Sequence, residues 1–428
     1  MQFGWERCCR DLAPTTVLGV VVDSGSHRRR GAFALLAVAA ALVAGVLAPA
    51  GAAETGGAGQ VDNGGNVGKT AFDRQGQWVW YVSRSEGGSI RGIVARAKRN
   101  DVGTVYIKSG DGDDYWSQFS RGLVRALHRA GLSVCAWHFV YGDQPLAEAR
   151  VSAMAVQRGA DCFAIDAEAD YEGKYAAADR YVRALRARIG DAFPLSLATF
   201  PYVDYHPSFP YSVFFGPGGA TYNQPQMYWK TIGTTVREVY EHTYLYNRIY
   251  GHPIYPIGQT YEAPGTAAIK QFRRFAASHG GLAPSWWSWQ ETNGREWGAL
   301  GADSALRPVA GYRQDPTHPV LRRKSRGDMV VWAQQHLVAA GADLPVTGFF
   351  GPRTARAVRE FKQSRGLPAN GVIDTDTWNA LLELTPYRPN WARRARAGAA
   401  ASRMLSASKP LSASLPAVAY EIPPGPNR

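Results

Sequence analysis

Short apolar segments alternate with amphipathic segments along most of this 428-residue chain, and this alternation restricts the possible folds more than any other feature. Eight short runs are rich in aromatic and β-branched residues, as strands are. These runs are residues 78–82, 104–107, 133–139, 162–165, 195–199, 224–229, 254–258 and 285–289. Apolar residues recur at helical spacing between several of them, over residues 90–99, 119–130, 147–157 and 175–189. Strands separated by helices are typical of a parallel sheet.

The number of strand-helix units favours a closed sheet over an open one. Eight units fit within roughly 220 residues, and no Gly-rich phosphate-binding loop follows the first strand. We therefore expect a TIM-like (β/α)8 barrel, of α/β class, over residues 71–310. Its active site is expected where the strands end.

The N-terminus has the order of a secretory signal. Three arginines, residues 28–30, precede an apolar run over residues 32–47, and several alanines follow near residue 50. We expect residues 1–53 to be a cleaved signal peptide and residues 54–70 to be a Gly-rich linker. An uncleaved membrane anchor is the alternative. After cleavage no apolar stretch of about 18 residues is left to form a stable membrane span, which predicts a secreted or cell-wall protein.

The formal net charge of +13 narrows the possible partners. Much of the positive charge lies in residues 385–428, which are rich in Ala, Ser and Pro and are expected to form a basic, disordered tail. A basic surface suits nucleic acid as well as anionic polymers of the cell wall. Because the chain is expected to be exported, we predict wall polymers and no nucleic acid as partners.

Cys135 and Cys162 are the cysteines that remain after signal cleavage. Both lie in apolar segments expected to be neighbouring strands, so a disulfide and two buried thiols are both compatible with the sequence. There is no metal-binding pattern. His138 has no His or Cys partner at ligand spacing, and we expect it to be a hydrogen-bonded structural residue. Neither a metal nor a cofactor is expected.

Residues 316–384 contain an internal repeat. The segment GFFGPRT at residues 348–354 aligns with GVIDTDT at residues 371–377, and each runs into a helix. A third helix is expected over residues 328–340. Together with LRRKSRGD at residues 321–328 and FKQSRGLP at residues 361–368, this segment resembles the peptidoglycan-binding domain of bacterial wall hydrolases. The resemblance implies a small three-helix domain that binds peptidoglycan.

Two acids, Asp166 and Glu168, end the apolar run over residues 163–165. They share one face of the expected strand, roughly 6.5–7 Å apart, and are expected to point into the barrel mouth. One ionised carboxylate keeps its neighbour protonated near neutral pH, and cleavage of a glycosidic bond needs such a proton donor. We expect Glu168 to be the general acid and Asp166 to stabilise positive charge or orient a substrate acetamido group. The alternative is that both are ordinary strand-end acids.

The first half of the barrel resembles glycoside hydrolase family 25, the muramidases that cut between N-acetylmuramic acid and N-acetylglucosamine. The motifs are YIKSGDG at residues 106–112, AGL at 130–132, WHF at 137–139 and IDAE at 165–168. The chain departs from this family at residues 80–83 (WYVS) and 287–291 (WSWQE), where the family carries acids in its first and last strands.

Other acids can replace the two that are missing. Glu291 is one candidate, and Asp204 and Glu262 are others from different strand ends. The fourth strand also partly matches family 18 chitinases, through Asp161, Asp166 and Glu168, although Ala164 stands in place of their middle Asp. The reaction is therefore left open between these two classes of glycosidase.

Aromatic and amide side chains near the expected strand ends complete the candidate site. Sugar rings stack on aromatic faces, and amides hydrogen-bond to hydroxyls. The expected substrate-binding residues are Trp137, Gln226, Tyr228, Trp229, Trp289, Gln290 and Glu291. The sequence thus predicts a secreted, muramidase-like glycoside hydrolase held on the wall by its C-terminal domain. A glycan-binding protein with a degenerate barrel and a glycosidase for another polysaccharide are the alternatives.

Overall fold

The computed structural model describes residues 70–281, 283–301 and 307–392. The expected signal peptide and the linker, apart from Thr70, lie outside the described residues, as does the chain beyond residue 392. None of the described helices is long and apolar enough to cross a membrane.

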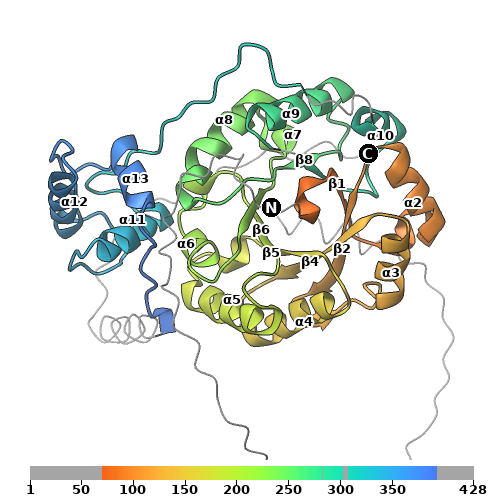
Figure 1. The fold of residues 1–428 in the computed structure, drawn as a ribbon, viewed down its shortest axis with the longest axis horizontal. Coiled ribbons are helices and arrows are strands. Elements are labelled where there is room, and N and C mark those ends of the chain that lie inside the picture. Colours follow the sequence, from red (N-terminus) through yellow and green to blue (C-terminus); the bar gives the residue numbers. More distant parts are fainter. Residues whose placement is uncertain (1–69, 282, 302–306, 393–428) are drawn as a thin grey trace, which may run out of the picture. The chain divides into compact units, whose positions relative to one another are not determined.

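Eight parallel strands form a barrel in Figure 1. They are β1 Gly76–Val79, β2 Thr104–Asp111, β4 Ser133–Val140, β5 Cys162–Ala167, β6 Leu195–Thr199, β7 Tyr222–Pro225, β8 Ile257–Gln259 and β9 Ser285–Trp287. Their order is β7-β6-β5-β4-β2-β1-β9-β8, and parallel bridges from Asn223 to Ile254 and from Gln226 to Ile257 connect the two outer strands. The sheet is therefore closed, which confirms the expected TIM-like barrel. Strand β3, Asp114–Tyr115, folds back on β2 as a short hairpin.

Helices surround the barrel and cover its outer face in Figure 1. They are α2 Ile90–Arg99, α3 Arg121–Arg129, α4 Pro145–Gln157, α5 Tyr175–Ile189, α6 Tyr211–Phe214, α7 Trp229–Ile232, α8 Val236–Asn247, α9 Thr266–Ser278 and α10 Gly294–Gly301. Local sequence determines where several of these helices begin: Ser89 is the N-cap of α2, and Ser120 is the N-cap of α3. The apolar stripe of each helix packs against outward-facing strand residues, which explains the helical periodicity between the strands.

Inward-facing residues fill the barrel below its mouth. Phe72, in the short 3-10 helix Ala71–Asp73 that precedes β1, lies 4.7 Å from Tyr222 between ring centroids. Trp78 stacks on Tyr106 at the same centroid distance, 4.7 Å. The barrel interior is therefore a packed aromatic core and not a channel.

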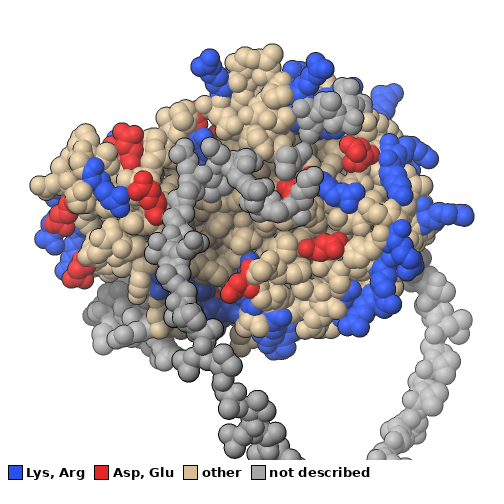
Figure 2. Space-filling model, viewed as in Figure 1, with Lys and Arg blue, Asp and Glu red and all other residues tan. Residues whose placement is uncertain are grey.

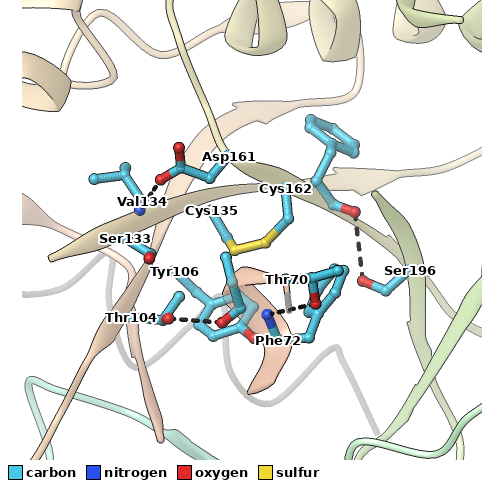
Figure 3. Close-up of a disulfide and its surroundings, with 12 residues drawn as sticks. Thr70, Phe72, Thr104, Tyr106, Ser133, Val134, Cys135, Asp161, Cys162 and Ser196 are labelled. Carbon is cyan, nitrogen blue, oxygen red and sulfur yellow. Dashed lines mark hydrogen bonds between the residues drawn. A yellow bond between two sulfur atoms is a disulfide. The ribbon is translucent and has the colours of Figure 1, made fainter. Parts of the chain in front are cut away.

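A disulfide joins Cys135 of β4 to Cys162 of β5 (Figure 3). The two residues are direct partners in the register of these neighbouring strands, with their Cα atoms 4.6 Å apart. Both side chains belong to the same interior cluster as Phe72 and Tyr106. Of the two states compatible with the sequence, the structure thus has the disulfide.

Three helices form the C-terminal unit: α11 Asp328–Ala339, α12 Pro352–Ser364 and α13 Thr375–Leu382. The two repeated segments form its turns, and β-bridges pair Leu321 with Ile373 and Arg326 with Phe349. Trp378 is buried, and its indole nitrogen donates to the Pro319 carbonyl at 2.8 Å. The predicted three-helix domain is confirmed.

Helix α11 also contacts the barrel through a buried carboxylate. The Asp328 side chain accepts hydrogen bonds from the Ser212 amide (2.8 Å), the Ser212 hydroxyl (2.6 Å) and the Tyr250 hydroxyl (2.9 Å). One turn later, the Trp332 indole donates to the Ile249 carbonyl at 2.6 Å. The C-terminal unit is therefore joined to the barrel by buried polar contacts.

The chain after α13 also contacts the barrel. Arg388 pairs with Asp179 of α5 at 2.9 Å and donates to the Pro217 carbonyl at 2.8 Å, while Trp391 lies 4.8 Å from Tyr175 between ring centroids. The sequence predicted a disordered tail from residue 385, whereas residues 385–392 are among the described residues and make these contacts. Composition did not indicate these contacts, because they depend on three partners that are distant in the sequence: Asp179, Pro217 and Tyr175.

Candidate active site

The two acids lie where β5 ends. Asp166 is in the strand, Glu168 follows its last residue, and both reach the amide of Gln226, which follows β7. The Gln226 Nε2 donates to Asp166 Oδ1 at 3.1 Å and to Glu168 Oε1 at 3.0 Å. Because one nitrogen serves both, these two oxygens lie within about 6 Å of each other.

The electrostatics of this carboxyl pair, Asp166 and Glu168, favour a retained proton. Asp166 is buried and Glu168 is half-buried. Burial first, and then the charge of Glu168, raise the pKa of Asp166 well above its usual range, while Lys108 and Gln226 act against them. Burial also raises the pKa of Glu168, again against the Gln226 hydrogen bond. The two groups titrate together and hold a proton at pH values where isolated carboxyls have lost theirs.

Tyr228 follows Gln226 and adds a phenol to this group. Burial raises the pKa of Tyr228 well above its usual range, and Tyr261, Asp166 and Glu168 raise it further. The Tyr228 and Tyr261 rings meet edge to face, with centroids 5.4 Å apart. The Tyr228 hydroxyl therefore stays protonated and remains a hydrogen-bond donor near the carboxyl pair.

Trp137 of β4 lies inside the barrel beneath the mouth. Its indole nitrogen donates to the Val79 carbonyl at 3.1 Å, and its ring meets Trp80 and Trp287 edge to face at 6.2 and 5.4 Å. Only 1% of Trp137 is exposed. This residue thus forms the floor of the mouth, below the more exposed Trp80 and Trp287.

Two further charged residues, Lys108 and Asp111 of β2, lie at this end of the barrel. Their side chains form an ion pair at 2.6 Å, and the Lys108 ammonium lies over the rings of Trp80, Trp116 and Trp137. Neither residue was among the expected site residues. A charged residue directly after an apolar run, here residues 105–107, is a usable signal for Lys108, but a register shift between Lys108 and Gly110 made the direction of Asp111 unpredictable.

Two of the expected substrate-binding tryptophans lie elsewhere. Trp229 packs on Phe272 with ring centroids 5.1 Å apart, and Trp289 packs on Trp297 at 4.9 Å. Both are buried in the core between strands and helices. Strand β9 ends at Trp287, so the two-residue alternation that would direct Trp289 inward does not extend to it.

Gln290 and Glu291 lie in the loop after β9. The Gln290 amide donates to the Tyr81 carbonyl at 2.8 Å and to the Ser85 hydroxyl at 2.9 Å, so it ties the last loop of the barrel to the first. Glu291 is exposed and accepts a hydrogen bond from Ser288 at 3.0 Å. Their loop is at the same barrel end as the carboxyl pair.

His138 has the structural role expected for it. Its ring nitrogens lie 2.8 Å from the Ser152 hydroxyl and 2.9 Å from the Gly112 carbonyl. Burial lowers the pKa of His138 to about 3, so the ring is neutral. Within the described part of the chain, no group of three His, Cys, Asp or Glu side chains could hold a metal ion.

Comparison with known proteins identifies the family of the C-terminal unit. Residues 326–381 match a family model described as "Putative peptidoglycan binding domain". The C-terminal unit belongs to this family. The chain is also 33% identical, over 85 residues, to an uncharacterized protein in the bpoA1 3' region of Kitasatospora aureofaciens. That match covers 19% of this chain and 70% of the relative, so the two proteins belong to one family, whose activity the relative's name does not state.

Solved structures similar to the chain include a peptidoglycan-binding protein, a chitinase and the catalytic domain of an endolysin. A Clostridioides difficile peptidoglycan-binding protein in complex with glutamine hydroxamate is 35% identical over 15% of this chain and 40% of its own, with a TM-score of 0.15. A class V chitinase from Pseudomonas fluorescens is 11% identical over 53% of this chain and 98% of its own, at 0.41. The catalytic domain of a Listeria phage endolysin is 16% identical over 31% and 67%, at 0.25. These TM-scores are too low to transfer an activity to this chain.

Proposed function

We propose that this chain is a glycoside hydrolase of the bacterial cell wall, which cuts peptidoglycan glycan strands at the carboxyl pair. One observation carries the proposal. Asp166 and Glu168 share the Gln226 amide at the C-terminal end of a parallel barrel, where such barrels place their catalytic groups. A pair that retains a proton can supply both the acid and the charge that glycoside cleavage requires.

The two acids take different roles in this proposal. Glu168 is the less buried of the two and lies past the end of the strand, so in this proposal it is the acid that reaches the leaving oxygen. Asp166 is deeper, and in its ionised form it stabilises the positive charge that develops on the sugar or orients an acetamido group. Tyr228 supplies a further hydrogen-bond donor. The proposed bond is the one that muramidases cut, after N-acetylmuramic acid.

The peptidoglycan-binding domain supports a wall polymer as the substrate. In this proposal the domain holds the enzyme on peptidoglycan, and the chain is secreted. Lys and Arg side chains gather over α2 and α3 at one side of the molecule in Figure 2. The exposed ones are Arg91, Lys98, Arg99, Arg121, Arg125 and Arg129. This basic surface suits anionic wall polymers as additional partners.

A glycan-binding protein without turnover is the second candidate. The observation that favours it is the segment directly after β1, where residues 80–83 read WYVS and provide no carboxylate. In that case the barrel holds wall glycan, and the protonated pair only hydrogen-bonds to it.

Digestion of purified peptidoglycan separates these candidates. The secreted chain is incubated with insoluble peptidoglycan, the products are reduced with borohydride, and the reduced ends are identified by mass spectrometry. Reduced N-acetylmuramic acid is the expected product, whereas reduced N-acetylglucosamine would indicate a glycosidase of different bond specificity. Absence of any new reducing end, with the protein still bound to the pellet, would contradict the enzyme and favour the binding protein.

A further inference from the structure

The C-terminal unit carries a cluster of unpaired positive charge in the turn before α11, residues 322–326, which we call the basic turn. Its exposed cations are Arg322, Arg323, Lys324 and Arg326. Within the part of the chain that the structure describes, no carboxylate forms an ion pair with any of them. Three cations of α12 differ, since each pairs with an acid, at 2.8, 3.0 and 3.6 Å. Crowded cations without counter-charges create a positive potential that attracts an anionic ligand.

Lys324 occupies a backbone position that disfavours a side chain. Its φ is 78°, in the left-handed region where glycine is the usual residue. Its amide donates to the Phe350 carbonyl at 3.0 Å, a bond that glycine would make equally well. The Lys324 ammonium has no hydrogen-bond or ion-pair partner among the described residues. A strained residue whose side chain makes no internal contact points to a role in binding rather than in folding.

An exposed aromatic ring lies beside the basic turn and is held in place. Phe349 forms a β-bridge with Arg326, whose guanidinium lies 4.3 Å from the centroid of the phenyl ring. The buried Gln334 amide fixes the turn that carries Phe349. Its oxygen accepts from the amides of Thr347 and Gly348, at 2.7 and 2.9 Å, and its nitrogen donates to the Phe349 carbonyl at 3.0 Å. A surface fixed in this way loses little freedom on binding.

We infer that the basic turn and Phe349 form the surface by which the C-terminal unit binds peptidoglycan, through the carboxylates of its peptides. The inference rests on the proposed function for the identity of the ligand alone. The family match to a peptidoglycan-binding domain spans residues 326–381 and includes Arg326 and Phe349. Guanidinium groups bind carboxylates with two parallel hydrogen bonds, and a phenyl ring offers an apolar face to the adjoining peptide. A phosphate-bearing wall polymer is the alternative anion, which the test below separates.

The basic turn leads directly into the contact between α11 and the barrel. The Asp328 amide donates to the Pro207 carbonyl at 2.7 Å, and Pro207 lies in the loop that follows β6. Parallel strands of a barrel end on the same side, so this loop belongs to the barrel end that carries Asp166 and Glu168. Peptidoglycan bound at the basic turn is therefore held at the end where the proposed cleavage takes place.

Sedimentation with purified peptidoglycan tests this surface on the full chain. Phosphate-bearing polymers are first removed with hydrofluoric acid, and every protein carries Glu168→Gln so that hydrolysis does not remove the ligand. Arg322→Gln with Arg323→Gln is expected to raise Kd by about tenfold or more, the scale for loss of hydrogen bonds to charged groups. Arg356→Gln with Arg365→Gln removes the same charge from α12 and should bind like the Glu168→Gln parent.

Lys324→Gly separates binding from folding. It should weaken binding because the ammonium is lost, while the urea midpoint should equal or exceed that of the parent because glycine relieves the strained backbone. Weaker binding together with a lower midpoint would indicate a structural role for Lys324 and count against the inference.

Amidation of the peptide carboxyls with carbodiimide and ammonia tests the chemistry of the ligand. The parent should bind amidated peptidoglycan about as weakly as the Arg322 and Arg323 double variant binds untreated peptidoglycan. Equal binding of the parent to both materials, equal binding by the double variant and the α12 control, or no binding by the parent after hydrofluoric acid treatment would each overturn the inference. Failure of the wild-type chain to release reducing ends contradicts the proposed hydrolase, whereas these binding measurements still decide the inference.

Discussion

Gln226 is hydrogen-bonded to both candidate catalytic acids. Its amide nitrogen donates to both, so a single side chain lowers the pKa of both carboxyls against the burial that raises them. A donor held in this place also fixes the distance between the acids, which determines whether a sugar fits between them.

Replacing Gln226 by Leu keeps the volume of the side chain and removes the donor. The pKa values of both acids should rise, so the basic limb of the pH–rate profile should move to higher pH, and kcat at neutral pH should fall by about tenfold or more because the acids lose their common support. Steady-state kinetics across pH measures both effects. A profile that superimposes on that of the wild type would show that the bridge has no catalytic role.

Several residues predicted for the mouth lie near one another although they follow the ends of their strands: Glu168 follows β5, and Gln226 and Tyr228 follow β7. Asp166, Glu168, Gln226 and Tyr228 were selected from strand period and chemistry, and the structure brings all four together. Trp289 is predicted in the same way, yet its ring packs on Trp297 in the core between strands and helices.

The disulfide acts at the level of paired strands. It links β4 to β5 at Cys135 and Cys162, which are 27 residues apart in sequence, two pleat repeats below Asp166 on the same strand face. A cross-link of this kind restricts the unfolded chain, and it also holds the strand that carries the acids against its neighbour.

Replacing both cysteines by Ala should destabilise the chain by about 3.5 kcal/mol, the value for a closed loop of this length. The measurement is the urea midpoint of the double variant, compared with the wild type under oxidising conditions and with the wild type after reduction. The variant and the reduced wild type should agree closely. Equal midpoints for the variant and the oxidised wild type would contradict this contribution.

The order of strands and helices in the barrel could mostly be predicted from the sequence. Eight runs at strand spacing with helical segments between them sufficed for the barrel, since few architectures accommodate that order. The sequence could not reveal the register shift in β2 or the β3 hairpin, because both depend on contacts between strands. The sequence likewise could not reveal that Lys108 lies over Trp80 and Trp137, because these rings come from other segments of the barrel.

For the whole molecule, the contact between α11 and the barrel is the feature that composition did not indicate. Asp328 is fully buried there, and burial raises its pKa to about 6 against the hydrogen bonds from Ser212 and Tyr250. A carboxyl whose pKa is higher in the folded state binds more protons when folded. Its contribution to stability is complete below the unfolded pKa of 3.8 and is lost as the pH rises through about 6.

Asp328→Asn should remove this dependence. Relative to the variant, the wild type should lose up to about 3 kcal/mol of unfolding free energy between pH 4 and pH 7, the amount that corresponds to a rise of this size in pKa. Urea unfolding of both proteins at several pH values gives the difference. A difference that stays constant over this range would mean that Asp328 does not titrate as described.

The central claim, that the carboxyl pair cuts wall glycan, is tested most directly by Glu168→Gln. This substitution keeps the shape of the side chain and removes its proton. Wild-type chain should release reducing ends from peptidoglycan, and the variant should be slower by about 10² or more while it still sediments with peptidoglycan through its C-terminal domain. Turnover of the variant within about twofold of the wild type would contradict the account.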